Sequence, residues 1–176
     1  MTKRIAFSAI AMALTVVCLF GASTIPTAKI SLLAIATVFG AVTVYEYGPK
    51  YGFIHYIGVS ILSLLLAPKK STVLIYIVFL GYYPLVKLYI EQIDKVVKEW
   101  VIKIIFFNVF LVIAYTIFKM FLIPIFNTTI VVFILKYLAL IIIGLELVFV
   151  IYDVVLSYLI AYYKKFISKK HTSAEK

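Results

Sequence analysis

The sequence consists of six long apolar segments that are separated by five short breaks containing proline, glycine, polar residues or charge. Of its 176 residues, 65% are hydrophobic and 14% are charged, whereas a soluble domain averages about 45–50% apolar and about 25% charged residues. At about 20 apolar residues per transmembrane helix, the length accommodates about five to seven helices and no soluble domain. The alternation of polar and apolar residues that is typical of β-barrels is absent. We therefore expect an all-α integral membrane protein.

The breaks divide the chain into six predicted transmembrane helices, because such residues usually mark turns. The breaks lie at residues 21–29, 45–52, 67–71, 87–103 and 124–129. The predicted helices cover residues 4–20, 30–46, 51–67, 72–90, 101–123 and 129–151. This interpretation makes residues 1–163 a single six-helix transmembrane domain.

The last apolar segment, residues 129–163, is too long for one span. As a helix it measures about 52 Å, against a hydrocarbon core of about 30 Å. We therefore predict a tilted span that ends near residue 151, followed by an amphipathic helix over residues 152–168 along the cytoplasmic interface. A disordered basic tail is expected at residues 169–176.

The lysine and arginine residues are distributed unevenly between the two sides of this bundle. If the N-terminus is cytoplasmic, the outer loops hold only Lys29, Lys69 and Lys70. The inner segments hold twelve basic residues: Lys3, Arg4, Lys50, Lys87, Lys95, Lys98, Lys103, Lys164, Lys165, Lys169, Lys170 and Lys176. The positive-inside rule then predicts a multi-pass plasma-membrane protein with both termini in the cytoplasm. A cleaved signal peptide at residues 1–22, which leaves five spans, is the alternative.

Several functional classes are disfavoured by the composition. The net charge of +10 comes from residues that flank apolar segments, so it indicates topology rather than nucleic-acid binding. The chain has two histidines and one cysteine, Cys18, and it contains neither a zinc-protease motif, a P-loop nor a serine-hydrolase motif. Glu146 and Asp153 lie seven residues apart, about 10 Å along a helix, which is far for an acid–base pair. We expect no enzyme activity, catalytic residue, metal site or cofactor.

The first helix carries a stripe of small residues, Ala6, Ala9 and Ala13. Small residues three or four positions apart allow another helix to approach closely in lipid. This stripe could pack inside the chain's own bundle or against another protein.

A basic six-helix membrane protein with an alanine-striped first helix resembles the substrate-binding S component of an energy-coupling factor (ECF) transporter. The A-x-x-x-A pattern is matched by Ala9 and Ala13, and residues 149–163 look like the final helix of some members. The resemblance implies capture of a small nutrient or vitamin from outside the cell. It also implies docking through the alanine stripe onto a transmembrane T component driven by two cytoplasmic ATPase subunits.

In an S component the ligand binds on the outer side, mainly between helices 4 to 6 and the first loop. The candidate ligand-binding residues on that basis are Lys29, Tyr76, Tyr115, Lys119, Lys136 and Glu146. Lysines with tyrosines suit a solute that bears a carboxylate or a phosphate. Alternatively, the lysines snorkel to the headgroups.

Two further functions stay open from the sequence. The chain could be a small accessory or structural membrane protein that packs into a larger complex and binds no solute. It could also be an ion-coupled or proton-coupled carrier that uses Glu146 and Asp153 as a relay, although no internal repeat supports this. Asp153 is expected at the inner boundary, and Glu146 within the membrane and either protonated or paired across the bundle.

Overall fold

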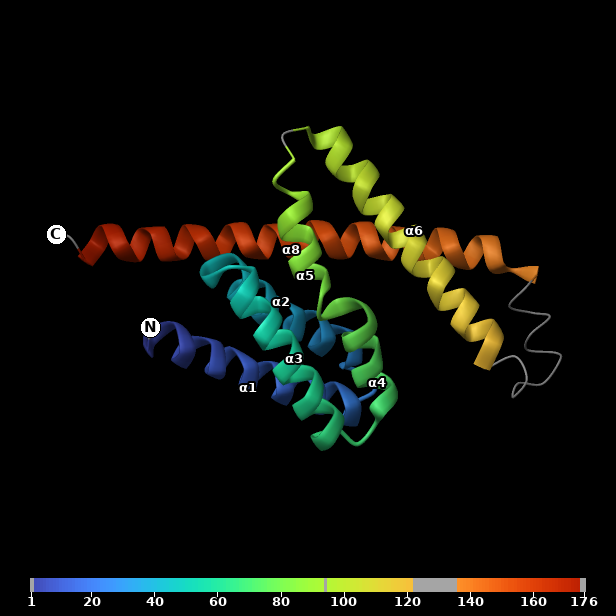
Figure 1. The fold of residues 1–176 in the computed structure, drawn as a ribbon, viewed down its shortest axis with the longest axis horizontal. Coiled ribbons are helices and arrows are strands. Elements are labelled where there is room, and N and C mark those ends of the chain that lie inside the picture. The colour runs from blue at the N-terminus through green and yellow to red at the C-terminus, as the bar shows by residue number, and fades with distance from the viewer. Residues whose placement is uncertain (1, 94, 122–135, 175–176) are drawn as a thin grey trace. The chain divides into compact units, whose positions relative to one another are not determined.

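The structure is a computed structural model that describes residues 2–93, 95–121 and 136–174 (Figure 1). All regular elements in these ranges are helices, which confirms the predicted all-α class. Within these described ranges, five helical stretches are long and apolar enough to cross a membrane. They are Arg4–Thr24, Lys29–Tyr47, Pro49–Leu66, Lys70–Ile90 and Ala139–Lys165.

The chain divides into two compact units. Unit 1 contains Met1–Gln92 and Leu156–Lys176, and unit 2 contains Ile93–Val155. The single six-helix domain expected from the sequence stays a prediction.

Three antiparallel helices form the centre of unit 1. They are α1 (Thr2–Thr24), α2 (Lys29–Tyr47) and α3 (Pro49–Leu66), and each packs against the other two (Figure 1). Their apolar core includes the buried side chains of Leu19 and Val59. Pro49 stands at the start of α3, where its missing N–H costs no helical hydrogen bond.

The interior of unit 1 is polar in many places, while its exterior is apolar. Buried polar side chains include Ser8, Thr15, Thr37, Thr43, His55, Ser63 and Thr72. The hydroxyls of Thr15, Thr37 and Thr43 are satisfied locally; Thr15 Oγ1, for example, donates to the carbonyl of Ala11 at 2.8 Å. On the outside, Ile30 is 83% exposed and Leu65 is 74% exposed. Large apolar side chains over most of the surface are the pattern expected when lipid rather than water is the solvent.

The fourth apolar stretch is interrupted, whereas we expected one helix over residues 72–90. It consists of α4 (Lys70–Ile75), the π-helix η1 (Tyr76–Leu80), a turn, and α5 (Tyr83–Ile90). Pro84 explains the break, because proline lacks an N–H and its ring clashes with the carbonyl four residues earlier. The amide of Gly81 donates instead to the carbonyl of Tyr76 at 2.6 Å. The Tyr56 hydroxyl donates to the Ile77 carbonyl at 3.0 Å, which satisfies another backbone group of the π-helix.

Unit 2 consists of α6 (Val96–Phe121) and the first part of α8 (Leu138–Ala174). Where we predicted a span that ends near residue 151 and a second helix over residues 152–168, one continuous helix is assigned, and it reaches Ala174 and so enters the expected tail. After Gly144 the helix contains neither glycine nor proline, so no residue in this part favours a break. The predicted start of this helix, residues 129–135, lies outside the described residues.

Replacement of Gly81 by alanine is expected to destabilise the fold. The added Cβ would lie 2.7 Å from Tyr76 Cε1 and 2.9 Å from Tyr56 Cδ2, and relief of such overpacking typically costs about 1–3 kcal/mol. The measurement is the thermal unfolding midpoint of the detergent-solubilised protein. Gly144→Ala is the matched control, because nothing lies within 4 Å of its Cβ position. Equal midpoints for both variants would contradict the close packing around the π-helix.

Candidate functional site

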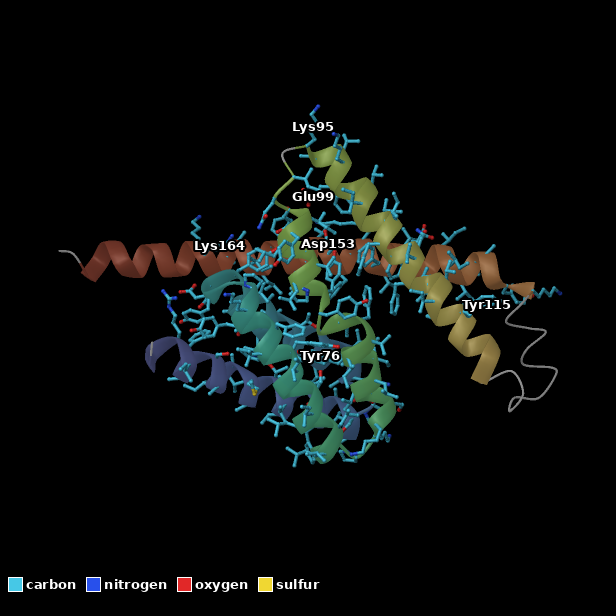
Figure 2. All side chains as sticks on the ribbon, in the orientation of Figure 1. Tyr76, Lys95, Glu99, Tyr115, Asp153 and Lys164 are labelled. Carbon is cyan, nitrogen blue, oxygen red and sulfur yellow. The ribbon has the colours of Figure 1, made fainter. Side chains whose placement is uncertain are left out.

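The predicted ligand-binding residues are distributed over both units. In unit 1, Lys29 is the first residue of α2 and is half-buried. Tyr76 begins the π-helix and is fully buried (Figure 2). These two side chains therefore have different environments within unit 1.

Tyr76 lies beside a buried polar group in the middle of the bundle. A Cβ added to Gly40 would lie 3.8 Å from the Tyr76 hydroxyl and 3.7 Å from His55 Nε2. That nitrogen is 3.2 Å from Thr15 Oγ1. His55 is only 1% exposed. His55 is buried together with its partner, because Thr15 lies on the buried face of α1.

The other predicted ligand residues belong to unit 2. Tyr115 is half-buried on α6 (Figure 2), and the side chain of Lys119 lies outside the described residues. Lys136 is exposed, with its Nζ 5.6 Å from the centre of the Tyr137 ring. The convergence of these residues on one outer cavity stays a prediction.

Glu146 has the cross-bundle partner that the sequence left unidentified. Its Oε1 accepts a hydrogen bond from Asn108 Nδ2 at 3.0 Å. Next to this pair, the rings of Phe107 and Phe149 stack with centres 4.3 Å apart and an interplanar angle of 3°. Residues later in α6 contact residues earlier in α8, so the two helices run antiparallel in this unit.

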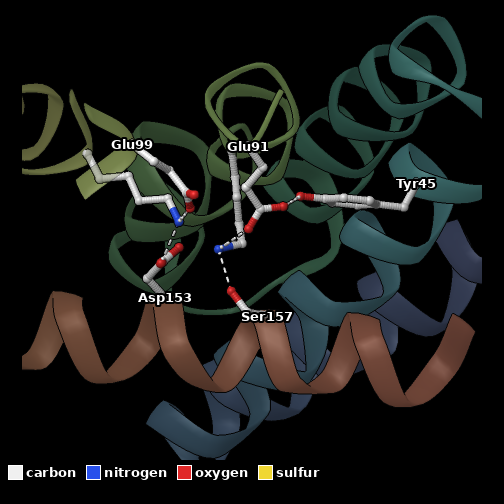
Figure 3. A network of polar contacts seen from close by, with 7 residues as sticks. Tyr45, Glu91, Glu99, Asp153 and Ser157 are labelled. Atoms are coloured by element: carbon white, nitrogen blue, oxygen red, sulfur yellow. Dashed lines mark hydrogen bonds and ion pairs between the residues drawn. The ribbon is translucent and has the colours of Figure 1, made fainter. Parts of the chain in front are cut away.

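An ion cluster at Lys103 is a further contact between α6 and α8 in unit 2 (Figure 3). Lys103 Nζ lies 2.7 Å from Asp153 Oδ2 and 2.6 Å from Glu99 Oε1. Lys103 and Asp153 are each 1% exposed, and the Glu99 side chain is 20% exposed. Asp153 is thus bound to a lysine from another helix, because a buried charge needs a partner.

A second ion cluster lies in unit 1 (Figure 3). Lys87 is fully buried, and its Nζ lies 2.8 Å from Glu91 Oε1 and 2.7 Å from the hydroxyl of Ser157. The Tyr45 hydroxyl donates to the other Glu91 oxygen at 2.5 Å. These contacts bind α5 to α2 and to the C-terminal part of α8 through charge-assisted hydrogen bonds.

We did not predict either ion cluster, since Lys87 and Lys103 were interpreted only as topology signals. The spacing between lysines and glutamates in the sequence nevertheless indicated two of these ion pairs. Lys87 with Glu91, and Glu99 with Lys103, are separated by four residues, which places each pair on one helix face. No comparable signal in the sequence connects Lys103 to Asp153, which is 50 residues away.

A hollow of about 410 Å³ lies along one face of α6. It is lined by Ile104, Ile105, Asn108, Val109, Val112 and Ile113. Because Asn108 is its one polar lining residue, the hollow has the character of a lipid-facing surface rather than of a site for an anion.

The alanine stripe lies on the outer surface of unit 1. Ala6, Ala9 and Ala13 are exposed, whereas Ala11 and Thr15 on the opposite face of α1 are buried. The stripe therefore does not face the α2 and α3 side of unit 1, and its docking onto another protein stays a prediction.

Comparisons with known proteins identify no relative. No protein-family model matches the chain, and no curated protein or solved structure shows significant similarity to it. The interpretation therefore depends on the residues and their geometry.

Replacing Lys103 by methionine is expected to destabilise the protein strongly, because it leaves Asp153 buried without its cation. Removing one partner of a buried ion pair typically costs about 3–5 kcal/mol. The double variant Lys103→Met/Asp153→Leu should recover most of this loss. Thermal unfolding in detergent provides the measurement.

Lys98→Met is the matched control, since Lys98 lies on the same helix and is exposed. If Lys103→Met and Lys98→Met unfold at the same temperature, the ion cluster does not stabilise the bundle.

Proposed function

We propose that this chain is the substrate-capture subunit of an ECF-type uptake transporter in the plasma membrane. In this proposal it spans the membrane six times with both termini in the cytoplasm. It binds a small nutrient from the outer side, and partner subunits hydrolyse ATP. The chain itself carries out transport rather than catalysis.

The observation that carries the proposal is the outward exposure of Ala6, Ala9 and Ala13. The surrounding exposed positions of α1 hold large side chains, among them Ile10 (63% exposed) and Val17 (66% exposed). From three alanines between such side chains we infer a shallow groove into which another helix can pack. A surface that contacts only lipid has no need of a groove, so this geometry favours a protein partner.

The internal ion clusters also support a rigid capture subunit. Their charges are matched within the chain: Lys87 with Glu91, and Lys103 with Asp153 and Glu99. A proton-coupled carrier needs an acid that exchanges protons along its path, whereas Asp153 has an ion-pair partner and is 1% exposed. This arrangement favours an S component over a proton-coupled carrier that uses Glu146 and Asp153 as a relay.

The second candidate is an accessory membrane protein that binds no solute. The alanine groove suits that role as well, so the identity of the partner distinguishes the two functions. A T component with two ATPases indicates an uptake transporter, and any other partner indicates an accessory role.

Affinity purification of the tagged chain from its native membranes tests the proposal. We expect a transmembrane subunit and two ATPases to co-purify with it. Ala9→Trp/Ala13→Trp should reduce their recovery by about tenfold or more, because overpacking costs about 1–3 kcal/mol and 1.4 kcal/mol corresponds to a factor of ten.

Ala161→Trp is the matched control, since Ala161 is exposed on α8 and belongs to the same unit. Its recovery of partner subunits should equal that of the unmodified chain. Absence of ATPases from the unmodified preparation contradicts the transporter function, and an equal loss in both variants contradicts docking through α1.

A further inference from the structure

Aromatic side chains join the helix ends at one end of unit 1. The rings of Phe7 and Tyr47 lie 5.3 Å apart, and those of Tyr47 and Tyr51 lie 6.1 Å apart. These contacts connect the first turns of α1, the end of α2 and the start of α3. Lys50 is adjacent to Tyr51 in sequence, and Arg4 is one helical turn before Phe7.

The C-terminal part of α8 reaches the same end of unit 1. Lys164 Nζ lies 4.9 Å from the centre of the Tyr45 ring, and Figure 2 labels this lysine on α8. Tyr45 is in turn hydrogen-bonded to Glu91, which follows the last residue of α5. Five helices of the unit therefore end or pass close to one another here.

The exposed side chains at this end are mainly cationic. Arg4, Lys50, Lys164 and Lys165 are all exposed. Glu46 is the exposed acid beside them, while Glu91 is neutralised by Lys87 at 2.8 Å. Among the described residues, the exposed side chains at this end therefore carry a net positive charge.

The exposed face of α8 changes from apolar residues to tyrosines and then to a lysine towards the C-terminus. Ile151 and Val155 are 63% and 46% exposed, and Tyr158 and Tyr162 follow at 73% and 72%. Lys165 comes next on this face and is also exposed. Apolar residues, then tyrosines, then a lysine are the order in which a helix passes from hydrocarbon into the headgroup region. From the start of the candidate span at Ala139, the helix reaches Tyr158 after about 30 Å, which matches the hydrocarbon thickness.

We propose that this surface binds the headgroups of acidic phospholipids. We define it as the basic aromatic belt, made of Arg4, Lys50, Tyr158, Tyr162, Lys164 and Lys165. Its cations complement the phosphate and the additional negative charge of such lipids, and its tyrosines lie at headgroup depth. The proposal concerns the lipid environment of unit 1 and does not depend on the transporter function.

Lipid retention tests the proposal. The full chain is reconstituted in nanodiscs that contain equal parts of phosphatidylglycerol and phosphatidylcholine. It is then extracted in mild detergent, and the retained lipids are quantified by mass spectrometry. We expect the unmodified chain to retain phosphatidylglycerol preferentially. The preference should decline as sodium chloride is raised, because salt screens exposed charges.

Lys50→Gln/Lys165→Gln should lower the ratio of retained phosphatidylglycerol to phosphatidylcholine by about fivefold or more. A lysine near an anionic surface contributes about 1 kcal/mol, which corresponds to roughly a factor of five. Lys69→Gln/Lys70→Gln is the matched control, since it removes two exposed lysines at the start of α4 in the same unit. Its ratio should equal that of the unmodified chain.

Three results would overturn the proposal: no preference in the unmodified chain, a preference that salt does not alter, or an equal reduction in both double variants. An unchanged ratio in Lys50→Gln/Lys165→Gln, accompanied by loss of co-purifying proteins, would assign the belt to a protein partner instead. All substituted lysines are at least partly exposed, so folding is retained, which circular dichroism verifies.

Discussion

A charged side chain that is buried in the protein has no water to solvate it, so its place in the fold depends on a partner. Lys103 and Asp153 illustrate this constraint, because each is 1% exposed and they lie 2.7 Å apart. Lys87 is fully buried and is neutralised by Glu91. The same requirement explains why Glu146 is bonded to Asn108. Ion pairs and hydrogen bonds between helices thus provide the specific contacts that apolar packing alone would not supply, since lipid competes for apolar surfaces.

The helical class, the membrane-protein class and most helix positions could be predicted from the sequence, because about 20 apolar residues between polar breaks have few other solutions. The interruption at Tyr76–Leu80 was harder to predict, since Pro84 permits either a kink or a break. The continuity of α8 could not be anticipated from length alone. The absence of glycine and proline after Gly144 favours one continuous helix.

The candidate site was predictable only in part. Glu146 was expected to be either protonated or paired across the bundle, and the structure shows a hydrogen bond from Asn108, but nothing in the local pattern identified Asn108. Spacing of four residues marks Lys87 with Glu91 and Glu99 with Lys103, whereas contacts such as Lys103 with Asp153 depend on tertiary packing. Exposure of the alanine stripe likewise depends on which face of α1 the bundle buries. Short-range periodicity does not determine that choice when both faces are apolar.

The account depends on a bilayer that encloses the described helices, with the basic aromatic belt on the cytoplasmic side. Single-cysteine accessibility tests this orientation most directly. Cys18 is replaced by alanine, and one cysteine is introduced at Thr27, Lys69, Lys50, Gln92 or Lys165. In intact cells a membrane-impermeant maleimide should label the cysteines at Thr27 and Lys69, and the other three only after permeabilisation. Labelling of the cysteines at Lys50, Gln92 or Lys165 in intact cells would contradict the topology and the proposed uptake function.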